Sequence, residues 1–152
     1  MMGVPSSGPW SSKWRRTPSL LKSIAAALRY AIQMAGPRAV HERTGSVLAE
    51  DLMVPRTIVG RGLGLMFRSR LGPGRGMWIN PCEGGSITMI FMRFRIDAVF
   101  LDKQERVKTV HRNLPTWWGV VWFTWGAHSV LELPAASTAD IDLQTGDRIL
   151  IG

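Results

Sequence analysis

Residues 86–102 read SITMIFMRFRIDAVFLD, and this stretch decides the fold of the chain. Two apolar runs, residues 86–92 and 96–101, flank a basic and aromatic Arg-Phe-Arg tripeptide. Both runs are rich in β-branched and aromatic residues, which is typical of strands covered on both faces. A charged link at 103–106 follows, and residues 107–111 then alternate between apolar and polar side chains as a half-buried strand does. The stretch therefore predicts core strands and an antiparallel hairpin.

The segments on either side of this stretch are short and separated by turn-forming residues. Strand-like runs recur along the body, and only two segments have the composition of a brief helix. This pattern predicts a mostly β fold, a small single-domain β-sandwich or barrel with one or two short helices. The predicted strands are residues 46–54, 77–79, 129–133 and 148–151, the predicted helices lie within 57–70 and 135–143, and residues 115–127 form an aromatic-rich loop.

The N-terminal residues differ in composition from the rest of the chain. Residues 1–14 are rich in Ser, Gly and Pro, and we expect such a segment to be disordered. A Thr-Pro start and a Gly-Pro stop bracket a helical pattern with basic residues on one face and small or apolar residues on the other. The sequence therefore predicts a basic extension (1–44) with an amphipathic helix at about 18–35, followed by a compact β domain (45–152).

Several interpretations of this helix compete. A transmembrane span is disfavoured because Lys22 and Arg29 would each cost roughly 2.5–3.5 kcal/mol near the bilayer centre. A secretory signal is disfavoured because its uncharged core, residues 23–28, is too short. An interfacial or transit-type helix fits the basic flanks and would contact a membrane surface. The leading hypothesis is a dispensable extension with translation beginning near Met34, so we expect a cytoplasmic protein, and a membrane-associated or exported one if the extension is genuine.

Most of the formal net charge of +8 lies in the extension. Residues 1–44 hold seven basic residues and one acidic residue, whereas residues 45–152 hold 12 basic and 10 acidic residues. The folded body is thus almost neutral, and we expect it not to bind nucleic acid. Cys82 is the only cysteine, which excludes an intrachain disulfide and fits a reducing compartment.

Five spaced motifs together resemble those of one known family. They read Gly64-Leu65-Met66-Phe67-Arg68, Gly76-Met77, Met92-Arg93-Phe94 with Ile96-Asp97 and Val99-Phe100-Leu101-Asp102, Leu131-Glu132-Leu133-Pro134-Ala135 and Gly146-Asp147-Arg148. From about Gly45 to the C-terminus the chain resembles the domain of unknown function 192 family, also called uncharacterised protein family 0127. The resemblance implies a compact, mostly β single domain and no known activity.

The chain departs from this family within the deciding stretch. Family members commonly have Ile-His-Thr-Phe before the Met-Arg-Phe motif and a proline within it. Here Thr88 and Met89 replace the His and the Thr, and Arg95 replaces the proline. A hypothesis that uses that histidine as a metal ligand or a base therefore does not apply to this chain.

We expect neither a metal nor a cofactor. His41, His111, His128 and Cys82 lack the short paired spacing of metal ligands. The glycine-rich segments lack the Gly-Lys-Ser/Thr ending of a phosphate loop, so backbone turns explain them better.

Charged residues inside apolar segments are the candidate binding residues. Asp97 lies four residues after Arg93 in an apolar run, and Glu132 is flanked by two leucines. Because a lone buried carboxylate is costly, we expect Asp97 to bind Arg93, Arg61 or a backbone turn, or else to line a ligand cleft. Glu132 poses the same question. Arg93, Asp97, Glu132, Arg61 and Trp117 are therefore the candidate ligand-binding residues, and no residue is named as catalytic.

The aromatic-rich loop holds four tryptophans and one phenylalanine. Such a cluster is typical of a surface that stacks on sugars or single-stranded bases, or of a loop that packs over the mouth of a barrel. We favour packing. No Lys or Arg lies between Trp117 and Trp125, which argues against nucleic acid.

Three hypotheses for the function follow. The first is a monomeric, non-enzymatic module that binds a small molecule or a protein partner in a cleft near the aromatic loop. The rival is a hydrolase-like enzyme for a sugar-like or acyl substrate, which requires two of Asp97, Asp102 and Glu132 to share a cavity as acid and base. The third is a purely structural or interaction module, which requires Trp117 and Trp118 to pack inward and no polar-lined pocket to exist.

Overall fold

A computed structural model of the chain describes residues 22–24, 26 and 36–152. The chain divides into two units, Met1–Met34 and Ala35–Gly152. The described residues of the first unit are helical, but most of the predicted helix at 18–35 and all of residues 1–14 lie outside the described residues. The strands lie in the second unit, which we call the body. No described helix is long and apolar enough to cross a membrane.

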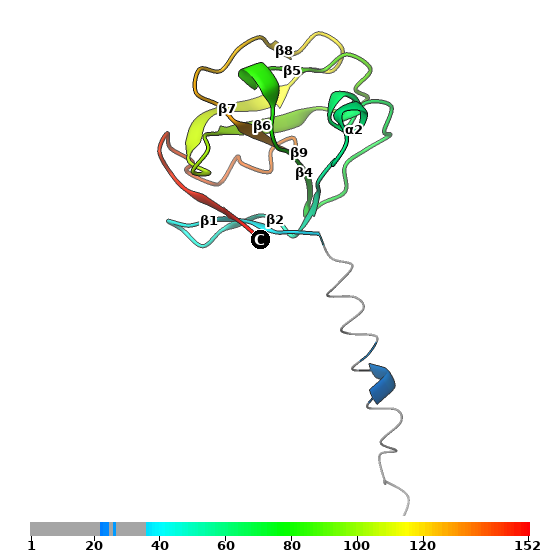
Figure 1. The fold of residues 1–152 in the computed structure, drawn as a ribbon, viewed down its shortest axis with the longest axis vertical. Helices are drawn as coiled ribbons and strands as arrows, with labels where there is room; N and C mark the ends of the chain where they lie inside the picture. Colours follow the sequence, from blue (N-terminus) through cyan, green and yellow to red (C-terminus); the bar gives the residue numbers. More distant parts are fainter. Residues whose placement is uncertain (1–21, 25, 27–35) are drawn as a thin grey trace, which may run out of the picture. The chain divides into compact units, whose positions relative to one another are not determined.

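A five-stranded sheet forms the centre of the body (Figure 1). Two of its three inner strands, β9 and β6, are buried along almost their whole length, which explains why residues 96–101 are apolar except for Asp97. β3 and β4 run parallel, and the other neighbours are antiparallel. In spatial order the strands are β3 (Asp51–Met53), β4 (Arg75–Ile79), β9 (Ser129–Pro134), β6 (Ile96–Leu101) and β7 (Val107–Leu114).

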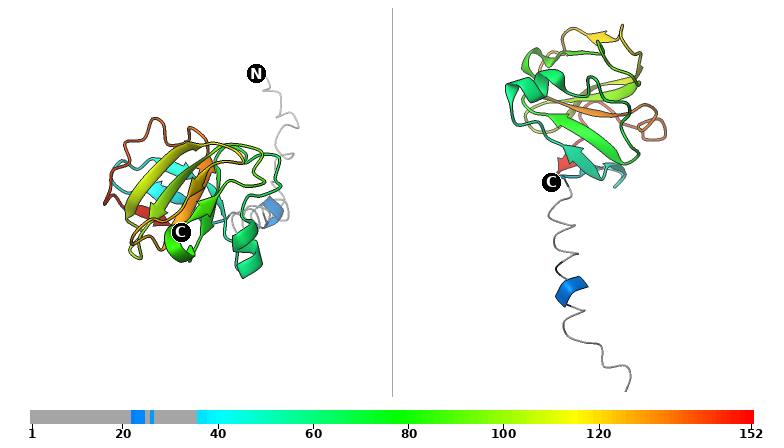
Figure 2. Two further views of the ribbon diagram at one scale, coloured as in Figure 1. Left: turned by 90° about the horizontal axis from the view of Figure 1, so that it is seen from above. Right: turned by 90° about the vertical axis from the view of Figure 1, so that its right-hand side faces the viewer.

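Two small sheets complete the body, which confirms the predicted mostly β fold. One has the order β10-β1-β2, and the other pairs β5 with β8 antiparallel. Figures 1 and 2 place these two sheets at opposite ends of the body. The strands are β1 (Ala39–His41), β2 (Val47–Ala49), β10 (Ile149–Ile151), β5 (Ile87–Thr88) and β8 (Val120–Val121).

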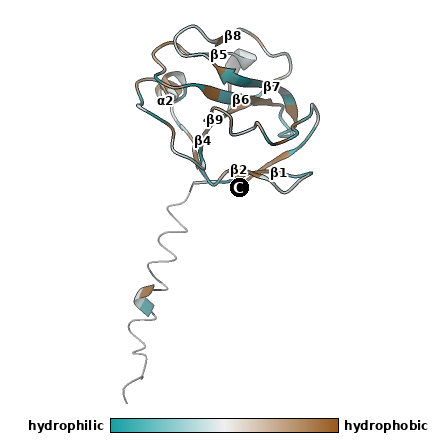
Figure 3. Ribbon diagram, turned by 180° about the vertical axis from the view of Figure 1, so that it is seen from behind, coloured by the Kyte–Doolittle hydropathy of each residue, from teal (hydrophilic) through white to brown (hydrophobic). Residues whose placement is uncertain are grey.

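The central sheet has a hydrophobic core on each face. Because side chains alternate along a strand, Val99 and Leu101 of β6 join the core shared with the β10-β1-β2 sheet. Ala98 and Phe100 join the opposite core, which packs under β5 and β8. Figure 3 shows hydrophobic colour along β6, as a strand buried on both faces requires.

Two short helices flank the central strands. Helix α2 (Ile58–Leu63) begins at Thr57, whose hydroxyl accepts the backbone N–H of Gly60 at 2.9 Å, a normal N-cap. A 3₁₀ turn, η1 (Glu83–Gly85), precedes β5. The predicted strand 46–54 is divided into β2 and β3 around Glu50. The structure also adds β1, which lies N-terminal to the predicted start of the domain at Gly45.

Two sequence predictions about secondary structure are wrong. The strand expected at 86–92 is only the two-residue β5, because a turn follows in which the Met92 N–H binds the Met89 carbonyl and Phe91 has a φ of 61°. The helix expected at 135–143 is a series of turns with Ala136 at a φ of 66°. The backbone of these turns donates to Asp97 instead of to a helical ladder.

Candidate functional site

Glu132 lies in the middle of β9, between Met77 of β4 and Ala98 of β6. Its side chain shares the face of Val130, whereas the two flanking leucines belong to the opposite core. Glu132 is only 6% exposed, and its Oε2 atom has no hydrogen-bond partner among the described residues. Burial raises the pKa of this carboxyl to about 7, because a charge in an apolar environment loses its hydration. A buried carboxyl without a hydrogen-bond partner destabilises the folded state, and such groups often have a functional role.

A pocket of about 280 Å³ lies over Glu132. Helix α2 and the residues after it form one wall, and the chain from Ser86 to Met92 forms another. Most of the lining is aliphatic or thioether, which is typical of small-molecule sites with a few placed polar groups. The polar residues at the pocket are Arg61, Cys82, Ser86, Thr88 and Glu132, and the apolar residues are Ile58, Leu63, Leu65, Met66, Ile79, Pro81, Ile87, Met89, Met92 and Ile96.

Gly64 brings the backbone close to the Glu132 carboxyl. A Cβ added at Gly64 would lie 3.9 Å from Glu132 Oε2 and 3.8 Å from Ile79 Cδ1. Gly64 also ends α2 with a φ of +47°, in the region that favours glycine. The glycine therefore serves both the helix end and the space above the carboxyl.

Cys82 lines the same pocket as a buried thiol. Its Sγ donates to the Ser86 carbonyl at 3.5 Å. Burial raises the pKa of the thiol above its ordinary value, and the charge of Glu132 adds to the rise, although the Ser86 bond opposes it. The thiol is therefore protonated at neutral pH, which disfavours a nucleophilic role.

Asp97 lies outside this pocket and binds the turns that replace the predicted helix. It is 0% exposed, and its Oδ1 accepts the backbone N–H groups of Asn113 at 2.8 Å and Ala136 at 3.3 Å. Its Oδ2 accepts the N–H of Thr138 at 3.0 Å and the Thr138 hydroxyl at 2.8 Å. We expected Asp97 to bind Arg93, Arg61 or a backbone turn. The structure shows that it binds backbone N–H groups, most of them in the turns after β9, and neither arginine.

The structure brings together two of the five sequence-predicted site residues. Arg61 and Glu132 line the pocket, whereas Arg93, Asp97 and Trp117 do not. Arg93 is exposed. Trp117 is half exposed, and its ring meets the edge of Phe91. Asp102 accepts the backbone N–H groups of Gln104 and Arg106 in the β6–β7 turn, so the three carboxylates of the enzyme hypothesis do not share the pocket.

Sequence reasoning missed the pocket residues Gly64, Ser86 and Thr88 as binding residues. Ser86 and Thr88 carry no local signal, because the strand and turn that place them depend on pairing with β8. The glycines at 60, 62 and 64 are a signal that could have marked a close backbone approach. Among the described residues, no group of three His, Cys, Asp or Glu side chains could hold a metal ion.

The aromatic loop points outward, so the preferred prediction that it packs over the body is wrong. Trp118, Trp122 and Trp125 are 87%, 82% and 82% exposed. The purely structural hypothesis required Trp118 to pack inward and required that no polar-lined pocket exist. The structure contradicts both requirements.

The fold and the site together define a small, mostly β domain with a carboxyl-floored pocket beside its central sheet. The sequence pattern of the DUF192 family, described as "Uncharacterized ACR, COG1430", matches residues 39–151. The chain therefore belongs to this family of uncharacterised proteins.

Two solved structures share the fold. A protein of unknown function from Novosphingobium aromaticivorans is 24% identical with a TM-score of 0.66, over 75% of this chain and 83% of that chain. A putative transcription regulator from Sinorhizobium meliloti is 22% identical with a TM-score of 0.63, over 76% of this chain and 91% of that chain. No curated protein matches the sequence.

Proposed function

We propose that the body is a non-enzymatic binding module for a small molecule that has an apolar part and a hydrogen-bond donor. The observation that carries the proposal is the unpartnered, buried Oε2 of Glu132 in the pocket. A ligand that donates to this atom would remove the cost of leaving it unsatisfied. An alkylammonium group is the best complement, because it also neutralises the ionised carboxylate.

The size and lining of the pocket support a small ligand. Its volume of about 280 Å³ lies just below the usual range of pockets for drug-sized ligands, so it suits a smaller molecule. The methionine and aliphatic walls fit a hydrocarbon chain, and methionines adapt to irregular shapes. Arg61 at the pocket adds a donor for a carbonyl or hydroxyl oxygen at the other end of the ligand.

The enzyme hypothesis is less well supported. Acid–base hydrolysis of a sugar-like substrate uses two carboxyl groups across one site. Here Asp97 and Asp102 bind backbone N–H groups elsewhere in the fold, and only Glu132 of the three lines the pocket. Glu132, with a pKa of about 7, can bind and release a proton, but the described residues that line the pocket include no second carboxyl to act as its acid or base partner.

A thermal-shift titration with matched probes tests the proposal. Hexylamine and hexanol have the same chain, and ligand binding raises Tm in proportion to occupancy. We expect hexylamine to raise Tm more at pH 8, where Glu132 is ionised, than at pH 5.5, where it is protonated. Glu132→Gln should remove the response to the amine, whereas the control Asp102→Asn should keep it. A response that survives in Glu132→Gln, or no response to either probe, would contradict the proposal.

A further inference from the structure

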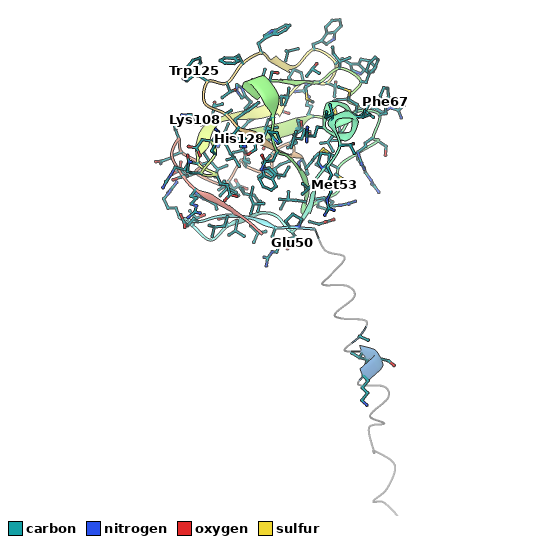
Figure 4. All side chains as sticks on the ribbon, in the orientation of Figure 1. Glu50, Met53, Phe67, Lys108, Trp125 and His128 are labelled. Atoms are coloured by element: carbon teal, nitrogen blue, oxygen red, sulfur yellow. The ribbon has the colours of Figure 1, made fainter. Side chains whose placement is uncertain are left out.

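A group of exposed aromatic side chains forms a surface that the proposed pocket does not use. We define the aromatic face as the exposed aromatic residues at positions 67, 91 and 117–125, which lie on three loops. Figure 4 shows the labelled Phe67 and Trp125 toward the end of the body that carries β5 and β8. Three of its tryptophans are more than four-fifths exposed. Large exposed apolar patches of this kind mark interaction surfaces.

Backbone and ring contacts hold the loops of the aromatic face together. Phe67 stacks on Phe91 with ring centroids 5.1 Å apart, and Phe91 meets the edge of Trp117 at 5.7 Å. The Phe67 N–H donates to the Phe91 carbonyl at 3.1 Å, and the Trp117 N–H donates to the Met89 carbonyl at 3.0 Å. The pairing of β5 with β8 joins the second loop to the third. These contacts therefore fix the three loops, and the rings that they carry, relative to one another.

The segments that form and flank the aromatic face carry charge of one sign. Residues 56–70, 86–95 and 115–128 contain six arginines and no acidic residue. Arg68 directly follows Phe67, Arg93 lies two residues after Phe91, and both are exposed. The ion pairs formed by described residues involve His41, Arg43, Arg75 and Arg148, so these six arginines make none with a described acidic group. These segments are therefore basic, although the body as a whole is almost neutral.

We propose that the aromatic face docks on the surface of a bilayer that contains anionic lipids. Tryptophan rings favour the headgroup level of a membrane, where one part of the ring is wet and the other is not. Arg68 and Arg93, which lie close to Phe67 and Phe91 in the sequence, are attracted by the negative surface potential of anionic lipids. Protruding rings with 82–87% exposure fit a fluid interface, whereas a protein partner would need a separate pocket for each ring. None of these segments carries an acidic residue that would repel anionic headgroups.

Vesicle sedimentation with the full-length chain tests this inference. The probe is phosphatidylcholine vesicles with about 30% phosphatidylserine, compared with pure phosphatidylcholine. We expect binding to the anionic vesicles that weakens at high ionic strength. The triple variant Trp118→Ser, Trp122→Ser, Trp125→Ser should lower the partition coefficient about tenfold or more, because membrane affinity scales with buried apolar area. Arg68→Gln and Arg93→Gln should each lower it about fivefold, on anionic vesicles alone.

The matched control removes exposed apolar side chains from the opposite end of the body. Val47→Ser combined with Leu150→Ser changes two exposed residues of β2 and β10 and should leave partitioning unchanged. Three outcomes would overturn the inference: no vesicle binding by the native chain, equal binding by the triple variant, or equal binding to neutral vesicles. The second outcome would assign binding to the N-terminal extension, which the triple variant retains. Self-association lost in the triple variant, without vesicle binding, would assign the face to a second copy.

Discussion

The buried carboxyl of Glu132 links the stability of the body to pH. Its pKa rises from an ordinary value of 4.5 to about 7 on folding, so the folded state holds its proton more tightly than the unfolded state. Stability is therefore lost as the pH rises from about 4.5 through 7, and the shift corresponds to about 3 kcal/mol at pH 8.

Glu132→Gln removes this charge while keeping the shape of the side chain. We expect the variant to be more stable than the native protein by about 2–3 kcal/mol at pH 8 and nearly equal at pH 4.5. Urea unfolding at both pH values measures the difference. Glu50→Gln, which changes an exposed carboxyl, should show no such pH dependence. A variant that is less stable than the native protein at pH 8 but not at pH 4.5 would mean that the ionised carboxylate has a partner.

Asp97 is the opposite case, a buried carboxylate whose hydrogen bonds are satisfied. Asp97→Ala would leave the N–H groups of Asn113 and Thr138 without their acceptor. We expect a loss of about 3–5 kcal/mol in the free energy of unfolding, because removing one partner of a buried charged network leaves the others unpaired. Asp102→Ala removes two bonds in a more exposed turn and should cost only about 1 kcal/mol. Equal losses in urea unfolding would contradict this distinction.

The sequence marks both carboxylates but cannot rank them. Each lies among apolar residues, so each is predicted to be a costly buried charge. The N–H groups that satisfy Asp97 come from residues 16, 39 and 41 positions away, and no local pattern encodes such contacts. Glu132 becomes the better binding candidate only when the structure shows that its Oε2 has no described partner.

At the scale of elements, Gly76 shows how tightly the central sheet is packed. It lies in β4 opposite Leu52 of β3. A Cβ at this position would lie 2.8 Å from Leu52 Cδ2, 3.0 Å from Leu133 Cδ2 and 3.2 Å from the Glu132 carbonyl oxygen. We expect Gly76→Ala to cost about 1–3 kcal/mol through overpacking, as measured by urea unfolding.

Gly62 provides the matched substitution in an open position. It lies in α2, and a Cβ there would meet nothing within 4 Å. Gly62→Ala should therefore stabilise the body by up to about 1 kcal/mol, because alanine restricts the unfolded chain and favours the helix. The two Gly→Ala changes should shift the urea midpoint in opposite directions, and a shift of the same sign would contradict the packing argument.

The sequence predicts well those strands whose conformation depends on their own residues and not on contacts with distant loops. The predicted strands at 77–79, 96–101 and 129–133 correspond to β4, β6 and β9, because short apolar runs rich in β-branched residues favour strands in the centre of a sheet. Residues 86–92 have a similar composition, but contacts with distant loops, including the Met89 carbonyl with Trp117, shape the turn after β5. For residues 86–92, composition therefore predicts an apolar segment but not the turn that replaces most of the expected strand.

For the whole molecule, the charge distribution separates two ends of the body. The segments that form and flank the aromatic face hold six arginines and no acidic residue. The end with β1 holds a hydrogen-bonded network in which Asp147 contacts Arg43 and His41, each at 2.9 Å. Hydrogen bonds from Arg43 hold the pKa of Asp147 well below its ordinary value. The network joins the β1–β2 turn to the turn before β10.

The same network makes β1 part of the folded body. β1 lies between β2 and β10, and the side chains of Ala39 and His41 are buried. A chain that begins at Gly45 would lack this middle strand, leaving the edges of β2 and β10 unpaired and removing His41 from Asp147. A chain that begins at Ala35 would keep every described strand.

We therefore expect the two truncations to differ sharply. The chain from Ala35 should unfold cooperatively in urea with native near-UV circular dichroism, because its three sheets and both cores are intact. The chain from Gly45 should lose the cooperative transition or aggregate, because two exposed edges replace a three-stranded sheet. Cooperative unfolding of the shorter chain at the same urea midpoint would show that β1 contributes nothing to stability and would restore the domain boundary at Gly45 that the composition alone predicts.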